Sequence, residues 1–410
     1  MKRDDIPDAA LIAELERAGT EPEAIQDRTM APGPARCRRS PREHGQIVLV
    51  LQGGGALGAY QVGAYEALHD AGVEPDWVIG TSIGAINASL IAGNAPEDRM
   101  PRLQEFWRRL QHGPWLDFIG ALPMVGPYAC NLATIGYGIP AFFKPNLPAF
   151  AGLHIPLGAE MASYYDTSAL ANTLAELVDF RRVNGRKTRL TVGAANVRTS
   201  EMRYFDSRDM DLDIRHVMAS GALPPAFPAV RMDGDLYWDG GILSNTPVEA
   251  VFDDNPRQNS IVFAVHIWNP NGTEPETIWQ VMNRQKDIQY SSRAVSHIAR
   301  QKQIHRLRHV IAELVKLLPE EKRKSEEVKL LATYGCLTRM HVVRLLALAL
   351  DGEDHTKDID FSSRGIRTRW EAGYTDTQQV LEMAPWSGEF DPVEGFILHE
   401  ARPGLVMTAG

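Results

Sequence analysis

A serine flanked by glycines follows a short apolar segment. The stretch "GTSIG" contains Gly80, Ser82 and Gly84 and fits the pattern G-x-S-x-G. In that pattern the serine occupies a sharp turn between a strand and a helix, with its hydroxyl exposed. The preceding "DWVIG" predicts a strand, and "SIGAINASLIAG" predicts a helix. Ser82 is therefore a candidate nucleophile, with Gly80 and Gly84 relieving crowding at the turn; the alternative is a serine that only caps the helix.

A second glycine-rich stretch, "LVLQGGGALG", raises the question of a dinucleotide. Gly53, Gly55 and Gly58 satisfy G-x-G-x-x-G, but that fingerprint needs an acidic residue at the end of the second strand. Here Asp76 precedes the second strand, so we expect no cofactor. Glycine turns also present backbone N–H groups to anions. We predict that Gly53, Gly54 and Gly55 form an oxyanion hole.

Two residues compete as the base that takes the proton of Ser82, which a serine nucleophile requires. Asp239 follows a turn and a short strand, "RMDGDLYW", and precedes Gly240 and Gly241, which permit close approach of a neighbour. His266 ends the strand-like "SIVFAVH" and completes the order Ser, Asp, His of hydrolase triads. These residues leave open a Ser82–Asp239 dyad, a triad with His266, and a turn aspartate without catalytic role.

The elements expected around these residues describe an α/β fold. The run "QIVLVLQ" predicts a buried strand, and strand, helix, strand and helix follow one another within about fifty residues, as in a parallel sheet. Ala59, Gly63 and Ala67 lie four residues apart, which predicts that the first helix packs closely on the sheet. Further strands are expected at "RLTVGAANV", "MRYFD", "LYWDGG" and "SIVFAVHIW".

Three regions are predicted along the chain. Residues 1–45, rich in Pro, Gly and Arg near their end, predict a flexible tail; residues 46–272 predict the catalytic domain; residues 273–410 predict a mostly helical extension. Within the extension, residues 304–318 show helical spacing of apolar side chains, and residues 342–350 also predict a helix.

Composition and sequence patterns argue against several kinds of partner and site. The 410 residues carry a formal net charge of −9, which argues against a nucleic-acid partner. Three cysteines without a C-x-x-C pair favour a reducing compartment, the cytoplasm. Long uncharged stretches are interrupted by Gly or Pro, so we expect no transmembrane helix. Asp209, Asp211 and Asp213 alternate as in a calcium loop, but Ile214 replaces the required glycine, and no metal site is predicted.

Together the motifs "GGGALG", "GTSIG", "ASGALPPAFPAV" and "DGG" resemble the patatin-like phospholipase family, over roughly residues 46–270. The resemblance implies a three-layer α/β/α fold, a dyad of Ser82 and Asp239, oxyanion-hole glycines at Gly53 to Gly55, and no metal. The family often has Arg or Lys at the fifth position of G-G-G-x-[RK]-G, where this chain has Leu57. Without that positive charge near the anion site, a preference for anionic phospholipid substrates is not expected, whereas the acyl-transfer chemistry is unaffected.

The predicted function is a serine acyl hydrolase that cleaves phospholipids, lysophospholipids or similar lipid esters through an acyl-enzyme. One alternative is an esterase or thioesterase for short hydroxyalkanoate esters, since the extension resembles that of bacterial patatin-like proteins of hydroxybutyrate metabolism. Another is a non-catalytic protein that binds a membrane or a partner. Residues 118–143 are a candidate lid, and the basic residues 284–316 are a candidate surface for peripheral membrane contact. The sequence leaves the oligomeric state open.

Overall fold

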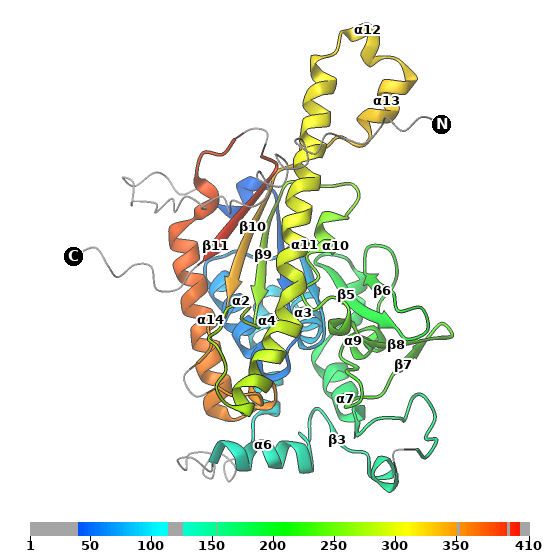
Figure 1. Ribbon diagram of the computed structural model, residues 1–410, viewed down its shortest axis with the longest axis vertical. Helices are drawn as coiled ribbons and strands as arrows, with labels where there is room; N and C mark the ends of the chain where they lie inside the picture. Colours follow the sequence, from blue (N-terminus) through cyan, green and yellow to red (C-terminus); the bar gives the residue numbers. More distant parts are fainter. Residues whose placement is uncertain (1–39, 114–125, 153, 351–352, 392–393, 402–410) are drawn as a thin grey trace, which may run out of the picture. The chain divides into compact units, whose positions relative to one another are not determined.

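A mixed sheet is the frame on which the candidate residues are held (Figure 1). The structure is a computed structural model, and it describes residues 40–113, 126–152, 154–350, 353–391 and 394–401. The strands of this sheet are β1 (Gln46–Leu51), β2 (Trp77–Gly80), β5 (Arg189–Asn196), β6 (Met202–Asp206), β7 (Val230–Met232), β8 (Asp235–Asp239), β9 (Ser260–His266), β10 (Met340–Leu346) and β11 (Phe396–Ala401).

The strand order is β11-β10-β9-β1-β2-β5-β8-β7, and β6 pairs with β5 off this path. From β11 to β5 neighbouring strands are parallel, whereas β5 pairs antiparallel with β6 and β8. A separate antiparallel pair joins β3 (Lys144–Pro145) to β4 (Tyr165–Asp166). The predicted mostly parallel sheet is therefore confirmed, with an antiparallel margin at the end that carries Asp239.

Helices cover both faces of the sheet. The α-helices are α2 (Ala59–Asp70), α3 (Ile83–Ala92), α4 (Pro96–Leu110), α6 (Gly126–Tyr137), α7 (Ser168–Leu177), α8 (Phe180–Asn184), α9 (Ile214–Ser220), α10 (Glu249–Phe252), α11 (Ile278–Leu317), α12 (Glu320–Arg323), α13 (Glu326–Ala332) and α14 (Ser363–Met383). The 3-10 helices are η1 (Pro41–His44), η2 (Gly55–Gly58), η3 (Leu147–Ala151), η4 (Gly240–Ile242), η5 (Lys357–Ile359) and η6 (Pro385–Ser387).

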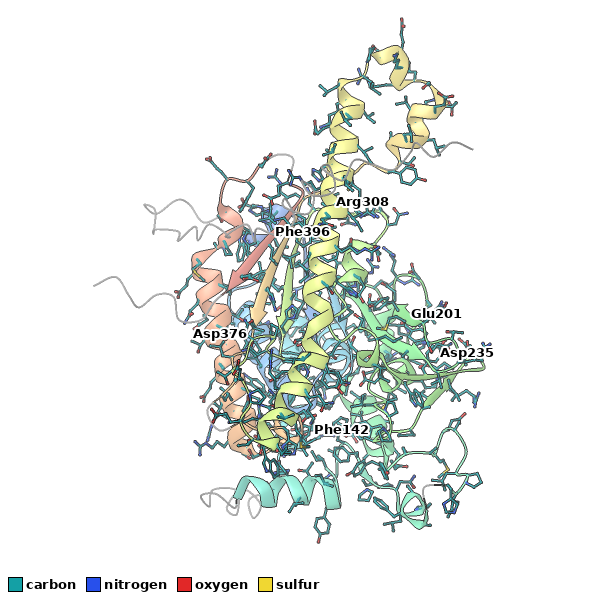
Figure 2. All side chains as sticks on the ribbon, in the orientation of Figure 1. Phe142, Glu201, Asp235, Arg308, Asp376 and Phe396 are labelled. Atoms are coloured by element: carbon teal, nitrogen blue, oxygen red, sulfur yellow. The ribbon has the colours of Figure 1, made fainter. Side chains whose placement is uncertain are left out.

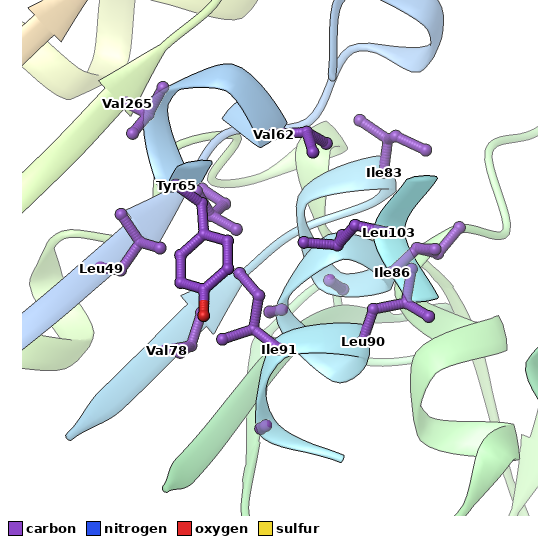
Figure 3. Packing of buried hydrophobic residues seen from close by; sticks show 14 of the residues in the cluster. Leu49, Val62, Tyr65, Val78, Ile83, Ile86, Leu90, Ile91, Leu103 and Val265 are labelled. Carbon is purple, nitrogen blue, oxygen red and sulfur yellow. The ribbon is translucent and has the colours of Figure 1, made fainter. Parts of the chain in front are cut away.

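Successive side chains of β1 point to opposite faces of the sheet and belong to two separate hydrophobic cores. Helices pack on both cores, which confirms the predicted three layers. Leu49 and its same-face neighbours pack with side chains of α2, α3 and α4, including Tyr65, Ile91 and Leu103 (Figure 3). Val48, on the opposite face, belongs to a smaller cluster with side chains of α10 and α11. Because successive strand residues point to opposite faces, one continuous apolar run fills both cores.

Gly63 of α2 serves a different contact from the predicted one. A Cβ added to Gly63 would lie 1.9 Å from the carbonyl oxygen of Trp370 on α14, and a Cβ on Gly373 would lie 2.0 Å from that of Tyr60. The glycines thus bring α2 and α14 together, rather than bringing α2 onto the sheet. The reason is that α14, which the α/β pattern of the first half did not include, packs on the outer side of α2.

The C-terminal region is mostly helical, as predicted, but it also extends the sheet. The prediction of a helix over residues 342–350 is wrong: β10 forms there and pairs in parallel with β9, and β11 pairs with β10. A short apolar run cannot be assigned to helix or strand by periodicity alone. The adjacent β-branched Val342 and Val343 favour a strand, and the open edge of β9 supplies its partner.

Candidate active site

Ser82 occupies a strained turn between β2 and α3. Its backbone angles are φ 56° and ψ −127°, a region that residues with a side chain rarely adopt and that is frequent at functional sites. A Cβ on Gly80 would lie 2.2 Å from the carbonyl oxygen of Gly84, and a Cβ on Gly84 would lie 2.3 Å from that of Leu51. Both flanking glycines are therefore required by close backbone contacts, and the turn has the geometry of a nucleophile elbow.

Strand β5 brings Asp239 to the same place. The register aligns Gly80, at the end of β2, with Val192, and Asp239, at the end of β8, with Ala194. Since Val192 and Ala194 are two residues apart on β5, the two strand ends lie close together. A Cβ on Gly240 would lie 2.5 Å from the carbonyl oxygen of Gly193, so the chain can leave β8 this close to β5 only with a glycine.

The Asp239 carboxyl is buried, with 1% of the residue exposed. Its Oδ1 accepts a hydrogen bond of 2.7 Å from the N–H of Gly241. Its Oδ2 has no partner of regular hydrogen-bond geometry among the described residues, although the Ser82 side chain lies close enough to lower the pKa of the carboxyl. Burial has the larger, opposite effect and raises the pKa of Asp239 to about 7. Such a carboxyl is both ionised and basic near neutral pH.

The three candidate oxyanion-hole glycines differ in what their N–H groups do. The N–H of Gly53 donates to the carbonyl of Asn245 at 3.1 Å. The carbonyl of Gly53 accepts bonds from Asn245 Nδ2 at 3.0 Å and from Trp268 Nε1 at 2.7 Å. The N–H groups of Gly54 and Gly55 have no acceptor within the described part of the chain. Gly53 is thus fixed in place, and Gly54 and Gly55 keep donors available for a ligand.

Sequence reasoning missed Asn245 and Trp268, which hold this turn. Asn245 follows the "DGG" stretch by four residues, and Trp268 follows His266 by two. Buried amide and indole groups are usually hydrogen-bonded, but nothing in their spacing identifies Gly53 as the partner. Trp268 reaches Gly53 because β1 lies beside β9 in the sheet, and Asn245 reaches it from the segment that follows η4.

His266 lies apart from the cavity that contains Ser82. It ends β9, is 1% exposed, and its carbonyl accepts the N–H of Ala347 at 2.9 Å. Burial, together with the nearby charge of Arg344, lowers the pKa of His266 to about 3. His266 is missing from the described residues that line the cavity.

Ser82 and Asp239 open into a cavity of about 160 Å³ with a largely aromatic and aliphatic lining. The apolar lining residues are Ile83, Ile86, Ile135, Phe142, Phe143, Leu223, Ala226, Phe227, Ile359 and Phe361, with Tyr165, Trp268 and Tyr290 beside them. In Figure 2, Phe142 lies next to α6, the helix that contributes Ile135. The candidate lid at residues 118–143 is thus part of the cavity wall from Thr134 onwards; residues 118–125 lie outside the described ranges.

The region after residue 272 contributes to this wall. Tyr290 of α11 and the segment Asp358, Ile359 and Phe361 line the cavity. The carbonyl of Tyr290 accepts bonds from Asn245 Nδ2 at 3.4 Å and from Gln52 Nε2 at 3.1 Å. The extension and the catalytic region therefore build one site between them.

The remaining candidates have structural contacts. Leu57 is buried in the core beside α2. Asp213 caps α9 by accepting the N–H of Arg215 at 2.9 Å. Among the described residues, no group of three or more His, Cys, Asp or Glu side chains is placed to hold a metal ion. No helix in the described ranges combines the length and the apolarity needed to cross a membrane.

An α/β sheet that presents a serine elbow beside a buried carboxyl defines a hydrolase of the ester-cleaving class. Two family comparisons agree with that class: residues 49–252 match a family described as patatin-like phospholipase, and residues 288–393 match one described as patatin phospholipase. The chain belongs to the patatin-like phospholipase family, a family of lipid ester hydrolases.

Curated relatives are similar over part of their length. A lysophospholipase nte1 of Aspergillus niger is 25% identical over 247 residues, which cover 58% of this chain and 13% of the relative. A patatin-like phospholipase domain-containing protein of Caenorhabditis elegans is 28% identical over 207 residues, covering 50% of this chain and 12% of the relative. This chain thus spans about an eighth of the length of these relatives. Among solved structures, VipD from Legionella pneumophila aligns with a TM-score of 0.35 and 17% identity, over 82% of this chain and 67% of VipD.

Proposed function

We propose that this protein is a serine acyl hydrolase that cleaves carboxylic esters of lipids through a dyad of Ser82 and Asp239. The observation that carries the proposal is the pairing of a strained serine elbow with a buried carboxyl whose Oδ2 has no other partner in the described part of the chain. Both residues line a cavity whose apolar wall suits an acyl chain.

In the proposed mechanism, Ser82 Oγ attacks the ester carbonyl carbon and its proton passes to Asp239 Oδ2. The N–H groups of Gly54 and Gly55 stabilise the oxyanion, since donors at a developing negative charge lower the barrier. Collapse of this intermediate breaks the bond to the alcohol, which leaves with the proton held by Asp239. Water then gives a proton to Asp239 and attacks the acyl-enzyme. The second intermediate releases the fatty acid and returns the proton to Ser82.

The test is hydrolysis of p-nitrophenyl esters of increasing acyl length by wild type, Ser82→Ala, Asp239→Asn and His266→Ala. We expect the first two variants to lose at least about a thousandfold in kcat/KM, because nucleophile and base act as one unit. His266→Ala should keep most of its activity if it folds. Loss of activity in a well-folded His266→Ala variant would replace the dyad with a triad. A wild-type protein inert on every ester would instead support a non-catalytic binding protein.

The cavity volume favours a second candidate function, the hydrolysis of esters with short acyl groups. A cavity of about 150 Å³ holds a molecule the size of benzene, and this one measures about 160 Å³. An acyl group of a few carbons is of this size, whereas a long acyl chain would extend beyond the cavity, and the half-exposed Ile135 marks one margin where it could do so. A maximum of kcat/KM at about six acyl carbons would favour this candidate.

We also propose peripheral contact with a lipid surface around the cavity mouth. Ile135 lines the cavity and is 48% exposed. Other apolar side chains are also largely exposed: Leu132 and Tyr137 on the same helix, and Leu147 and Phe150 of η3. Apolar residues of this kind insert into a lipid interface. By contrast, Lys302 and Lys316 of the basic stretch pair with Glu394 and Glu313.

The contact is tested by flotation with phosphatidylcholine vesicles. The variant Leu147→Ser/Phe150→Ser should bind several-fold more weakly, while Leu330→Ser, an equally exposed change on α13, should bind as wild type does. Binding that needs anionic lipid and disappears in salt would assign the contact to the basic stretch instead. Localisation in the cytoplasm is proposed on the sparse cysteines alone.

A further inference from the structure

We propose that Asp358 makes the cavity select esters whose alcohol part carries no net negative charge. The inference rests on the proposed function and narrows its substrate class. Of the described residues that line the cavity, the charged ones are Asp239 and Asp358, both carboxylates, and none is a lysine or an arginine. A substrate with an anionic head group would therefore find no free cation among these lining residues, because the Asp358 carboxylate occupies Lys286.

Asp358 lies beside the atoms where the ester would react. A Cβ on Gly55 would be 2.2 Å from the main-chain oxygen of Asp358, so η5 packs directly against the glycine turn. The Asp358 side chain is also near the cavity: together with burial, the charges of Asp239 and Asp358 raise the pKa of Tyr290, a lining residue. The main chain of Asp358 thus borders the cavity beside Gly55, and its carboxylate is close enough to Tyr290 to act on the hydroxyl of that residue.

The cations near this side are engaged with other groups. Lys286 Nζ binds Asp358 Oδ1 at 2.6 Å, and Lys357 Nζ binds Asp287 Oδ1 at 2.7 Å in a buried pair. The guanidinium of Arg284 donates to main-chain carbonyls of the segment before α11. None of these three residues lines the cavity. An anionic head group would have to displace a carboxylate from Lys286 before it gained a cation.

The glycine turn itself supplies no positive charge. Leu57, within η2, is apolar and 5% exposed in the core beside α2. Since charges of like sign repel strongly where water is excluded, a phosphate close to the scissile ester should be disfavoured. Esters whose alcohol part is uncharged carry no such penalty. Examples are esters of glycerol, and esters of a hydroxy acid whose carboxyl group is itself esterified.

The experiment compares 1-octanoylglycerol with 1-octanoylglycerol 3-phosphate, two esters that share acyl chain and glycerol and differ in the phosphate. We expect wild type to favour the neutral ester by at least about tenfold in kcat/KM at low salt, and by less at high salt. Asp358→Asn leaves Lys286 without its carboxylate, so it should raise the relative rate on the phosphate ester by about tenfold. Glu313→Gln, which unpairs Lys316 far along α11, is the matched control and should leave the ratio unchanged.

Lys286→Gln provides an opposite change that keeps the test valid if Asp358→Asn fails to fold. It leaves the Asp358 carboxylate uncompensated and should strengthen the preference for the neutral ester. Equal wild-type rates on the two esters, or unchanged ratios in both variants, would overturn the inference while leaving the proposed function intact. An enzyme inactive on both octanoyl esters and on p-nitrophenyl esters would refute the proposed function itself.

Discussion

Gly55 of the glycine turn lies directly against the main-chain carbonyl oxygen of Asp358, so closely that a Cβ on Gly55 would be 2.2 Å from that oxygen. This contact joins η2, which presents the proposed oxyanion donors, to η5 in the C-terminal region. The position of the donors therefore depends on a segment that follows them by three hundred residues.

Gly55→Ala should remove most of the activity. The new methyl group would collide with Asp358 and displace the Gly54 and Gly55 N–H groups, and loss of one oxyanion donor lowers kcat by about a hundredfold or more. Gly72→Ala is the matched control, because Gly72 also has a positive φ, +71° against +55° at Gly55, but its Cβ would meet no atom within 4 Å. We expect Gly72→Ala to cost about 1 kcal/mol of stability with full activity. Equal activities in the two folded variants would argue against the oxyanion role.

Activity should rise with pH through neutrality. Asp239 acts as a base only when ionised, and burial raises its pKa to about 7. We therefore expect kcat/KM to fall tenfold per unit below that pH and to level off above it. The profile is measured with a leaving group whose signal does not change with pH. If kcat/KM instead reached half its maximum near the ordinary pKa of aspartate, about 4, the base would not be a carboxyl buried away from water.

Asp239→Asn should stabilise the fold at high pH. The folded-state pKa of Asp239, about 7, is above the model value of 3.8. The native carboxyl therefore favours its neutral form, and wild type loses stability as pH rises from about 4 to about 7, by at most about 4 kcal/mol. The asparagine removes that loss.

Thermal unfolding at pH 4 and pH 8 measures this difference. The melting temperature of Asp239→Asn should exceed that of wild type at pH 8 and match it more closely at pH 4. Ser82→Ala keeps the carboxyl and should therefore keep the pH dependence of wild type. An asparagine variant that is less stable than wild type at pH 8 would show that the buried charge is compensated.

Ile135→Ala should shift activity toward longer acyl chains. Ile135 lines the cavity at its exposed margin, so a smaller side chain widens the path to the surface. Leu132→Ala, on the same helix but not among the lining residues, is the control. The ratio of kcat/KM for twelve-carbon and four-carbon esters should rise by about tenfold in Ile135→Ala only. An unchanged ratio would mean that α6 does not limit chain length.

Local sequence determined the elements that present Ser82. A buried apolar run, a glycine-flanked serine and a helical run of small residues fix a strand, an elbow and a helix between Trp77 and Ala92. The glycines at 80 and 84 are required by contacts inside this unit or with the adjacent β1, which is why the pattern was informative.

Tertiary structure decided what surrounds the serine. The approach of Asp239 depends on β2 and β8 pairing with consecutive parts of β5, the bond from Trp268 to Gly53 depends on β9 lying beside β1, and the contact of Asp358 with Gly55 depends on how the C-terminal region packs. Pairings between distant segments are set by the packing of whole layers, so they can hardly be predicted from the identity of single residues. For the same reason residues 342–346, within a run that is ambiguous in isolation, form a strand where the edge of β9 is available.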